Sequence, residues 1–156
     1  MNGKILGVVI VGAGLIAGVA LYYLQVYAYY KPVNLTQVDL RLTSVVTGEP
    51  DFFLYDDLHA IDADSSPLRF RACMTTSESL ATLTEDFVIY DQAEPLVAPG
   101  WFDCFDATEV GEALEQDRAI AFLGQRDIID GIDRVIAVHE DGRAFAWHQL
   151  NDKLKK

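Results

Sequence analysis

Residues 8–18 read VVIVGAGLIAG, and the interpretation of this stretch decides the fold of the chain. Gly12, Gly14 and Ala17 match the G-x-G-x-x-G/A pattern of a dinucleotide-binding turn, in which glycines let the backbone approach a pyrophosphate. The same stretch is also apolar enough to belong to a membrane-spanning helix. The two alternatives predict different proteins, and the residues around the motif distinguish them.

The surroundings of the glycine motif do not fit a nucleotide site. The helix after such a turn needs a polar outer face, but residues 15–30 carry no charge, and Gln25 is their only strongly polar side chain. The acid that binds the ribose is expected about 20 residues past the motif, and the nearest one, Asp39, lies too far along the chain. We therefore favour the membrane helix.

An uncharged and mostly apolar run extends from Ile5 to Tyr30. A spanning helix needs about 20 such residues, so this run can cross a bilayer with some tilt. Its far end is rich in tyrosine, which prefers the lipid headgroup region, and this predicts an interfacial belt of Tyr22, Tyr23, Tyr27, Tyr29 and Tyr30. A cleaved signal peptide is the alternative. However, the apolar run continues well past the small-x-small site at 18–20, so we expect an uncleaved anchor over residues 1–30.

Charge predicts the orientation of this anchor. The N-terminal tail is positive, whereas residues 32–156 hold all 24 acidic residues and 10 of the 12 basic ones, a net charge of −14. The positive-inside rule then places the N-terminus in the cytoplasm and the following domain outside, in the periplasm of a Gram-negative bacterium. Such an acidic domain argues against binding nucleic acid or lying on anionic lipid, and leaves a basic protein partner open.

Glycines mark one face of the predicted helix. At 100° per residue, four of them fall within about 60° of one another. Together with Gln25, which lies on the same stripe, they are Gly3, Gly7, Gly14 and Gly18. Small residues let a second helix approach closely, and a polar side chain can hydrogen-bond across the contact. We therefore expect a partner helix, from another membrane protein or from a second copy of the chain. The alternative is that glycine is simply common in membrane helices.

The rest of the chain is long enough for one small domain with its own core. We expect a linker at 31–37, an extracytoplasmic domain at 38–150 and a flexible, lysine-rich tail at 151–156. The domain is expected to be α+β, an antiparallel sheet with about two helices.

Alternation of apolar and polar residues predicts the strands of this domain. Residues 38–42 and 68–74 alternate, and the second run places Cys73 on the face opposite its apolar side chains. Residues 52–55 are a further expected strand, and residues 61–67 a polar turn.

Capping residues predict two helices. Thr76 or Ser77 is expected to begin a short helix whose inner face carries Leu80, Leu83 and Phe87. Asp106, followed three residues later by Glu109, resembles a capping box and is expected to begin a second helix that ends near residue 116.

The clearest unit is a hairpin near the C-terminus. Residues 134–139 and 144–150 flank Asp141-Gly142, and this dipeptide between alternating runs is a strong hairpin signal. A turn centred on that dipeptide predicts that His148 lies opposite Val135.

Two cysteines, Cys73 and Cys104, lie 31 residues apart. Outside the cytoplasm such a pair predicts a disulfide. Two free thiols are the alternative. A reactive thiol fits less well, because neither cysteine lies in a C-x-x-C motif, and Asp103 and Asp106 disfavour the thiolate that reactivity requires.

Other polar and aromatic residues do not form a recognisable catalytic or metal motif. The three histidines, His59, His139 and His148, lack the spacing of a zinc site, and the acids at 127–133 lack the alternation of a calcium loop. We therefore expect no metal, no cofactor and no catalytic residue. Three aromatic residues in a turn-like stretch are either core or an exposed partner patch: Trp101, Phe102 and Phe105.

Four stretches carry a resemblance: MNGK before the apolar run, RFRACMTT, GWFDCFDA and the closing DGRAFAWHQ. They resemble a family of small single-pass alphaproteobacterial membrane proteins of unknown function. The resemblance covers most of the chain and implies a bacterial inner membrane, but it implies no activity.

These observations together predict a non-catalytic membrane protein. We expect an accessory or assembly subunit of a larger inner-membrane complex, bound through the glycine stripe and the acidic domain. A homodimeric, membrane-anchored periplasmic protein is the alternative, and a periplasmic thiol-redox factor is a third.

Overall fold

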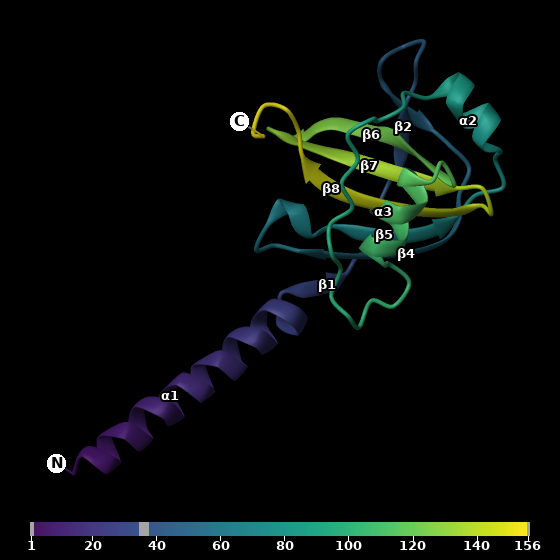
Figure 1. Ribbon diagram of the computed structural model, residues 1–156. Coiled ribbons are helices and arrows are strands. Elements are labelled where there is room, and N and C mark those ends of the chain that lie inside the picture. The colour runs from purple at the N-terminus through teal and green to yellow at the C-terminus, as the bar shows by residue number, and fades with distance from the viewer. Residues whose placement is uncertain (1, 35–37, 156) are drawn as a thin grey trace.

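The chain begins with a long helix that projects away from a folded domain. The computed structural model describes residues 2–34 and 38–155. Helix α1 (Gly3–Tyr23) continues into a π-helical turn, η1 (Leu24–Ala28), and none of its residues is buried. Figure 1 shows this helix extending from one end of the domain. Its 26 residues rise about 39 Å and are apolar enough to cross a membrane.

The domain is built around a six-stranded antiparallel sheet with the order β1-β4-β5-β8-β7-β6. In that order the strands are β1 (Tyr30–Pro32), β4 (Asp56–Ala63), β5 (Arg71–Thr75), β8 (Arg143–Leu150), β7 (Ile132–His139) and β6 (Ala119–Ile129). The other elements are the hairpin β2 (Arg41–Thr43) with β3 (Pro50–Phe52), the 3-10 turn η2 (Pro67–Arg69), and the helices α2 (Leu80–Asp86) and α3 (Ala107–Glu115). The predicted α+β class is confirmed.

Alternation along the strands divides the core into two layers. On β5, Ala72 and Met74 join the cluster beneath β2, β3 and α2, whereas Cys73 between them joins the cluster beneath α3. On β8, Ala146 and Trp147 divide in the same way. The sheet is therefore covered on both faces, which explains why its central strands β7 and β8 are apolar on both sides.

The start of the predicted linker at 31–37 is part of the sheet. Tyr30 to Pro32 form β1, which pairs with residues 61–63 of β4. For the same reason the polar turn predicted at 61–67 begins later, because its first three residues are held in the strand pair. Pro32 is tolerated because β1 lies at the edge of the sheet. Residues 35–37 of the linker lie outside the described residues.

The strand predicted at 52–55 is displaced toward the N-terminus and forms β3. The segment after Phe52 is held by side chains instead of a strand partner. The Leu54 amide donates to the Glu78 carboxylate at 3.1 Å, and the Thr76 hydroxyl donates to the Leu54 carbonyl at 2.6 Å. This use of Thr76 also explains why α2 begins later than predicted, with Ser79 as the N-cap that accepts from the Thr82 amide at 3.1 Å.

The second cap and the C-terminal hairpin form largely as predicted. Asp106 caps α3 by accepting from the amides of residues 108 and 109 at 2.8 and 3.2 Å. The hairpin register differs by one residue, so that His148 lies opposite Arg134 and not Val135. The reason is a three-residue loop: the Gly142 amide donates to the His139 carbonyl at 3.0 Å, and Gly142 adopts a φ of +87°.

The C-terminal tail is held against the domain through Lys155. Asn151 is buried, and Lys153 forms an ion pair with Asp127 at 2.7 Å. Lys155 pairs with Glu94 at 3.2 Å. Residues 151–155, the described part of the segment expected to be a flexible tail, form a turn with these contacts.

Candidate functional site

The junction between helix and domain is the most distinctive polar site of the molecule. The last carbonyls of a helix have no partner within it, and here the domain supplies two donors. The Arg69 guanidinium donates to the Gln25 carbonyl at 2.9 Å, and the Trp101 indole N–H donates to the Val26 carbonyl at 2.6 Å. A cation at the helix C-terminus is also favoured by the helix dipole. The helix end is thus capped from two separate segments of the domain.

Tyr30 completes this junction. Its ring lies edge-on to Trp101, with centroids 6.0 Å apart, and the Arg69 guanidinium lies 5.3 Å from its centre. Of the five tyrosines predicted to form an interfacial belt, Tyr30 is therefore half-buried on β1. The other four lie exposed on the helix, its π-helical turn and the residue directly after that turn: Tyr22, Tyr23, Tyr27 and Tyr29.

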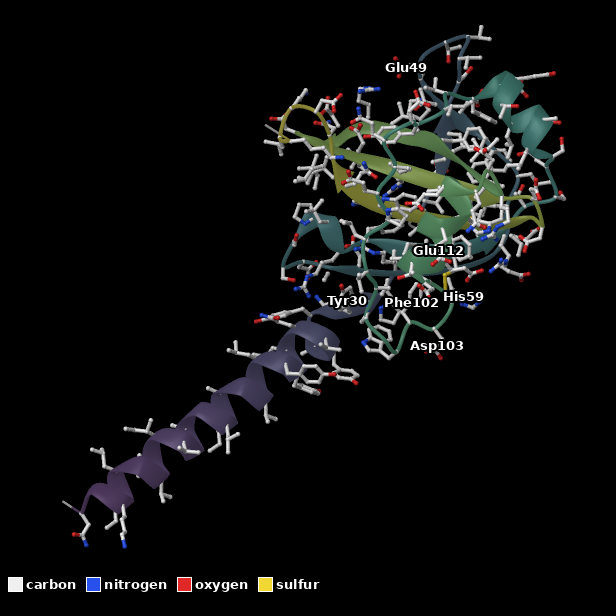
Figure 2. All side chains as sticks on the ribbon, viewed as in Figure 1. Tyr30, Glu49, His59, Phe102, Asp103 and Glu112 are labelled. Carbon is white, nitrogen blue, oxygen red and sulfur yellow. A yellow bond between two sulfur atoms is a disulfide. The ribbon has the colours of Figure 1, made fainter. Side chains whose placement is uncertain are left out.

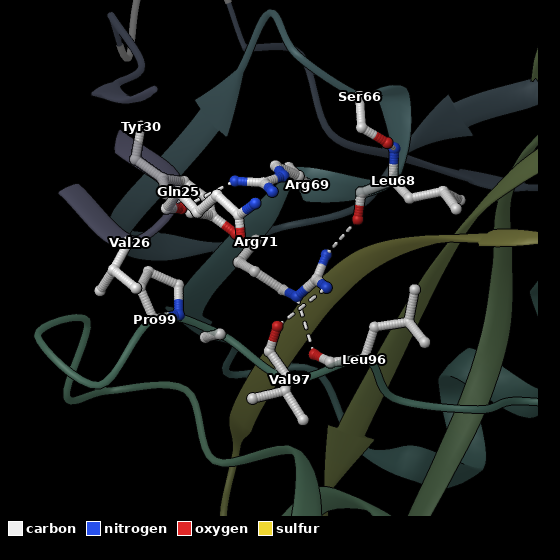
Figure 3. A pocket seen from close by; sticks show the side chains of 11 residues that line it. Gln25, Val26, Tyr30, Ser66, Leu68, Arg69, Arg71, Leu96, Val97 and Pro99 are labelled. Atoms are coloured by element: carbon white, nitrogen blue, oxygen red, sulfur yellow. Dashed lines mark hydrogen bonds between the residues drawn. The ribbon is translucent and has the colours of Figure 1, made fainter. Parts of the chain in front are cut away.

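A cavity of about 400 Å³ opens beside the capped helix end. Figure 3 shows that Arg71 lies at its centre, with its guanidinium bonded to backbone carbonyls. Four carbonyls accept from it at 2.6–3.1 Å, those of Leu68, Phe70, Leu96 and Val97. Arg71 is only 3% exposed, and burial lowers its pKa to about 10. Among the described residues no carboxylate lies within ion-pair distance of it, so its charge is solvated by the backbone alone.

A disulfide holds the loop that carries Trp101. Cys73 on β5 and Cys104 are bonded, with Cα atoms 6.2 Å apart, so the predicted disulfide is confirmed. The aromatic stretch before it does not form one exposed patch. Phe105 is buried in the core beneath α3, Phe102 is half-buried beside it, and Trp101 contacts the helix end. Figure 2 shows Phe102 and Tyr30 at the same end of the domain.

The folded domain of this chain matches a known protein family. A model described as "Family of unknown function (DUF6446)" matches residues 40–156, three quarters of the chain. The chain belongs to DUF6446. The match includes the disulfide and Arg71, and it begins after the helix and β1. Comparisons with curated proteins and with solved structures gave no match.

The two buried histidines of this DUF6446 chain have structural surroundings. His148 donates from Nδ1 to the Pro67 carbonyl at 2.8 Å and accepts at Nε2 from Arg134 at 3.1 Å. Burial and the neighbouring Arg134 charge lower the pKa of His148 to about 4, so it stays neutral. Burial also lowers the pKa of His139, whose Nε2 has no hydrogen-bond partner. His59 lies exposed on β4, so the three do not converge.

The acids at 127–133 form a structural network in this chain. Asp133 is fully buried and accepts from the Asp127 amide, the Asn151 amide group and the Tyr90 hydroxyl at 2.8–3.1 Å. Hydrogen bonds from Lys153 and Asn151 lower the pKa of Asp127 to about 2. The network ties the β6–β7 turn to the C-terminal segment. Within residues 2–34 and 38–155, no three metal-ligating side chains converge.

The glycine stripe of the DUF6446 chain faces open space. A Cβ atom added at any of its four positions would meet no other atom within 4 Å: Gly3, Gly7, Gly14 and Gly18. Gln25 lies at the other end of the helix, where it is exposed and lines the cavity. Its carbonyl is used by Arg69, so this residue takes part in the junction as well as lying on the stripe.

The sequence analysis did not identify Arg69 and Arg71 as site residues. A usable signal was present, because the alternation at 68–74 places both arginines on the face of Cys73, away from the apolar side chains. A buried cation on a strand needs acceptors, which makes Arg71, the first residue of β5, a candidate for a polar site. The partners of Arg69 and Trp101 on the helix are 44 and 75 residues away, and periodicity carries no information about such contacts.

Proposed function

We propose that this chain is a non-catalytic, single-pass membrane protein that serves as an accessory or assembly subunit of a larger inner-membrane complex. One observation carries the proposal. The domain caps the C-terminal end of the helix, whereas the glycine face toward the N-terminus is left open along the apolar segment. A helix held in this way presents one face in a defined direction relative to its domain. That arrangement suits lateral docking on a second helix.

Several features support the proposed placement of the chain. A stable disulfide is typical of domains outside the cytoplasm, in agreement with the orientation that the charge distribution favours. The capping of Gln25 and Val26 by the domain makes the end of the helix an integral part of the fold. This favours a retained anchor over a cleaved signal peptide. The resemblance to alphaproteobacterial proteins fits an inner membrane with a periplasmic domain.

A homodimer is the second candidate, because the same glycine face could pack on its own copy. A thiol-redox role is less well supported. Cys73 is 7% exposed, and the pair holds the loop that bears Trp101.

Affinity purification of tagged full-length protein in mild detergent tests the proposal. The informative variant is Gly14→Leu/Gly18→Leu, which fills the stripe. Gly12→Leu is the matched control, since Gly12 lies about 150° around the helix from the stripe. A defined set of membrane proteins should accompany the wild type and the control but not the double variant. Recovery of the chain alone at dimer mass favours the homodimer, and an unchanged set with the double variant contradicts docking through the glycines.

A further inference from the structure

The cavity at the helix–domain junction has two chemically different walls. Arg69 and Tyr30 supply hydrogen-bond donors on one side, where the buried Arg71 adds positive charge, and residues such as Val26 and Pro99 line the other side with apolar surface. Figure 3 shows Arg69 and Arg71 side by side with Val26 and Pro99 across from them. A ligand that matches both walls carries an anionic group next to a hydrocarbon part.

The two arginines provide unneutralised positive charge. Arg69 uses one N–H group for the Gln25 carbonyl, and its remaining donors have no partner within the described part of the chain. Arg71 has no ion-pair partner there either, and the attraction of Asp62 reaches it only from a distance. By contrast, the nearby Lys31 is paired with Asp64 at 2.6 Å. In a domain with a net charge of −14, two neighbouring arginines without a carboxylate partner among the described residues mark an anion site, with Arg69 as the accessible donor.

The position of the cavity indicates where its ligand comes from. It lies beside the end of the apolar helix, at the level of the exposed tyrosines that mark the headgroup region, because Gln25 and Val26 line it between Tyr23 and Tyr27. Val97 at its rim is 81% exposed, and Trp101 nearby is 37% exposed. Exposed apolar and indole side chains at this level fit contact with lipid better than contact with water.

We propose that this cavity binds the phosphate group of a phospholipid from the surrounding leaflet. Arg69 contacts the phosphate through its unused N–H groups, the buried Arg71 adds positive charge beneath the cavity, and the apolar wall contacts the glycerol and the first part of the acyl chains. Guanidinium groups suit phosphate because their planar fork donates two parallel hydrogen bonds. A bound lipid would also stabilise the junction that Arg69 and Trp101 form with the helix. The inference rests on the proposed membrane anchoring but not on any partner subunit.

Native mass spectrometry of the full-length protein in mild detergent tests this site. The protein is titrated with phosphatidylglycerol and, separately, with diacylglycerol of the same acyl chains. Arg69→Gln removes a donor from the cavity. Arg126→Gln is the matched control, because Arg126 is exposed on β6 and lines a different pocket. We expect one retained phosphatidylglycerol, about tenfold weaker retention of diacylglycerol, and about tenfold weaker phosphatidylglycerol binding with Arg69→Gln only.

Three results would overturn the inference: equal retention of both lipids, equal loss with both variants, or complete displacement by millimolar inorganic phosphate, which would indicate a soluble ligand. The comparison of lipids needs no variant, so it remains decisive if Arg69→Gln affects folding. Carbonate washing of membranes separates this inference from the proposed anchoring. A chain released by the wash has no anchor, whereas a retained chain without lipid selectivity contradicts only the lipid site.

Discussion

Removal of the disulfide is expected to destabilise the domain strongly. The bond joins Cys73 in the central part of the sheet to Cys104 in the loop before α3. That loop carries Trp101, three residues away, which caps the helix end. Replacing both cysteines by alanine therefore releases a segment that contains α2 and the loop that caps the helix end. The double variant tests how much of the order in this segment depends on the bond.

The expected magnitude follows from the length of the closed loop. For a separation of 31 residues, the chain-entropy model gives about 12 cal/mol/K, or roughly 3.7 kcal/mol at 25 °C. A domain of this size is typically stable by about 5–15 kcal/mol, so the loss is a large fraction of the total. With an unfolding entropy of about 2.1 cal/mol/K per residue over about 125 residues, the melting temperature should fall by about 14 °C.

Near-ultraviolet circular dichroism of the full-length protein in detergent is a suitable assay, because Trp147 is fully buried and reports on core packing. Reduction of the wild type serves as the control, since it opens the same loop without changing the sequence. The reduced wild type and the Cys73→Ala/Cys104→Ala variant should melt at similar temperatures. A decrease of less than about 5 °C in both would refute the loop-entropy reasoning.

Four further predictions concern local interactions. Asp106→Ala removes the N-cap of α3 and should lower the free energy of unfolding by about 1 kcal/mol, seen as a lower urea midpoint. His148 has a pKa of about 4 in the fold, so only the unfolded chain binds its proton between that pH and about 6.5. The contribution of neutral His148 to the free energy of unfolding, of order 3 kcal/mol, should be complete above pH 6.5 and should be lost as the pH falls toward 4. A His148→Asn variant whose stability changes just as steeply over that range would argue against this assignment. Gly142→Ala should destabilise by about 1–3 kcal/mol, because φ is +87° and a Cβ would lie 2.7 Å from the Thr76 carbonyl oxygen. Gly111→Ala in open space on α3 should instead stabilise by about 0.5–1 kcal/mol in the same urea titration.

Local patterns predicted the parts of the fold that depend on neighbours in sequence. The alternation at 68–74 correctly separated Cys73 from Ala72 and Met74, because a strand buried on both faces still alternates between two core layers. Asp106 was identified as a cap because capping involves residues only two and three positions away. The apolar helix was evident because its length and composition are intrinsic to the segment.

Contacts between distant segments were not predictable in this way. Strand β1 has only three residues, one of them proline, so it shows no alternation of apolar and polar residues. It forms a strand because it pairs with β4. The caps from Arg69 and Trp101 depend on loop paths that bring distant residues to the helix end. The predicted hairpin register is wrong by one residue because Asp141-Gly142 fits both a two-residue and a three-residue loop. The local sequence does not distinguish between these two loops.

The short strand β1 has a consequence for how the domain behaves when it is separated from helix α1. It lies outside the region that matches DUF6446, yet it covers the backbone of β4 at 61–63. A chain cut just before residue 40 would leave that edge with unpaired amide and carbonyl groups, next to the buried Ile61. Open edges of this kind promote intermolecular strand pairing and aggregation. Tyr30, the first residue of β1, is therefore a better starting point for a fragment without helix α1, because β1 then still covers the edge of β4 and protects it from intermolecular strand pairing.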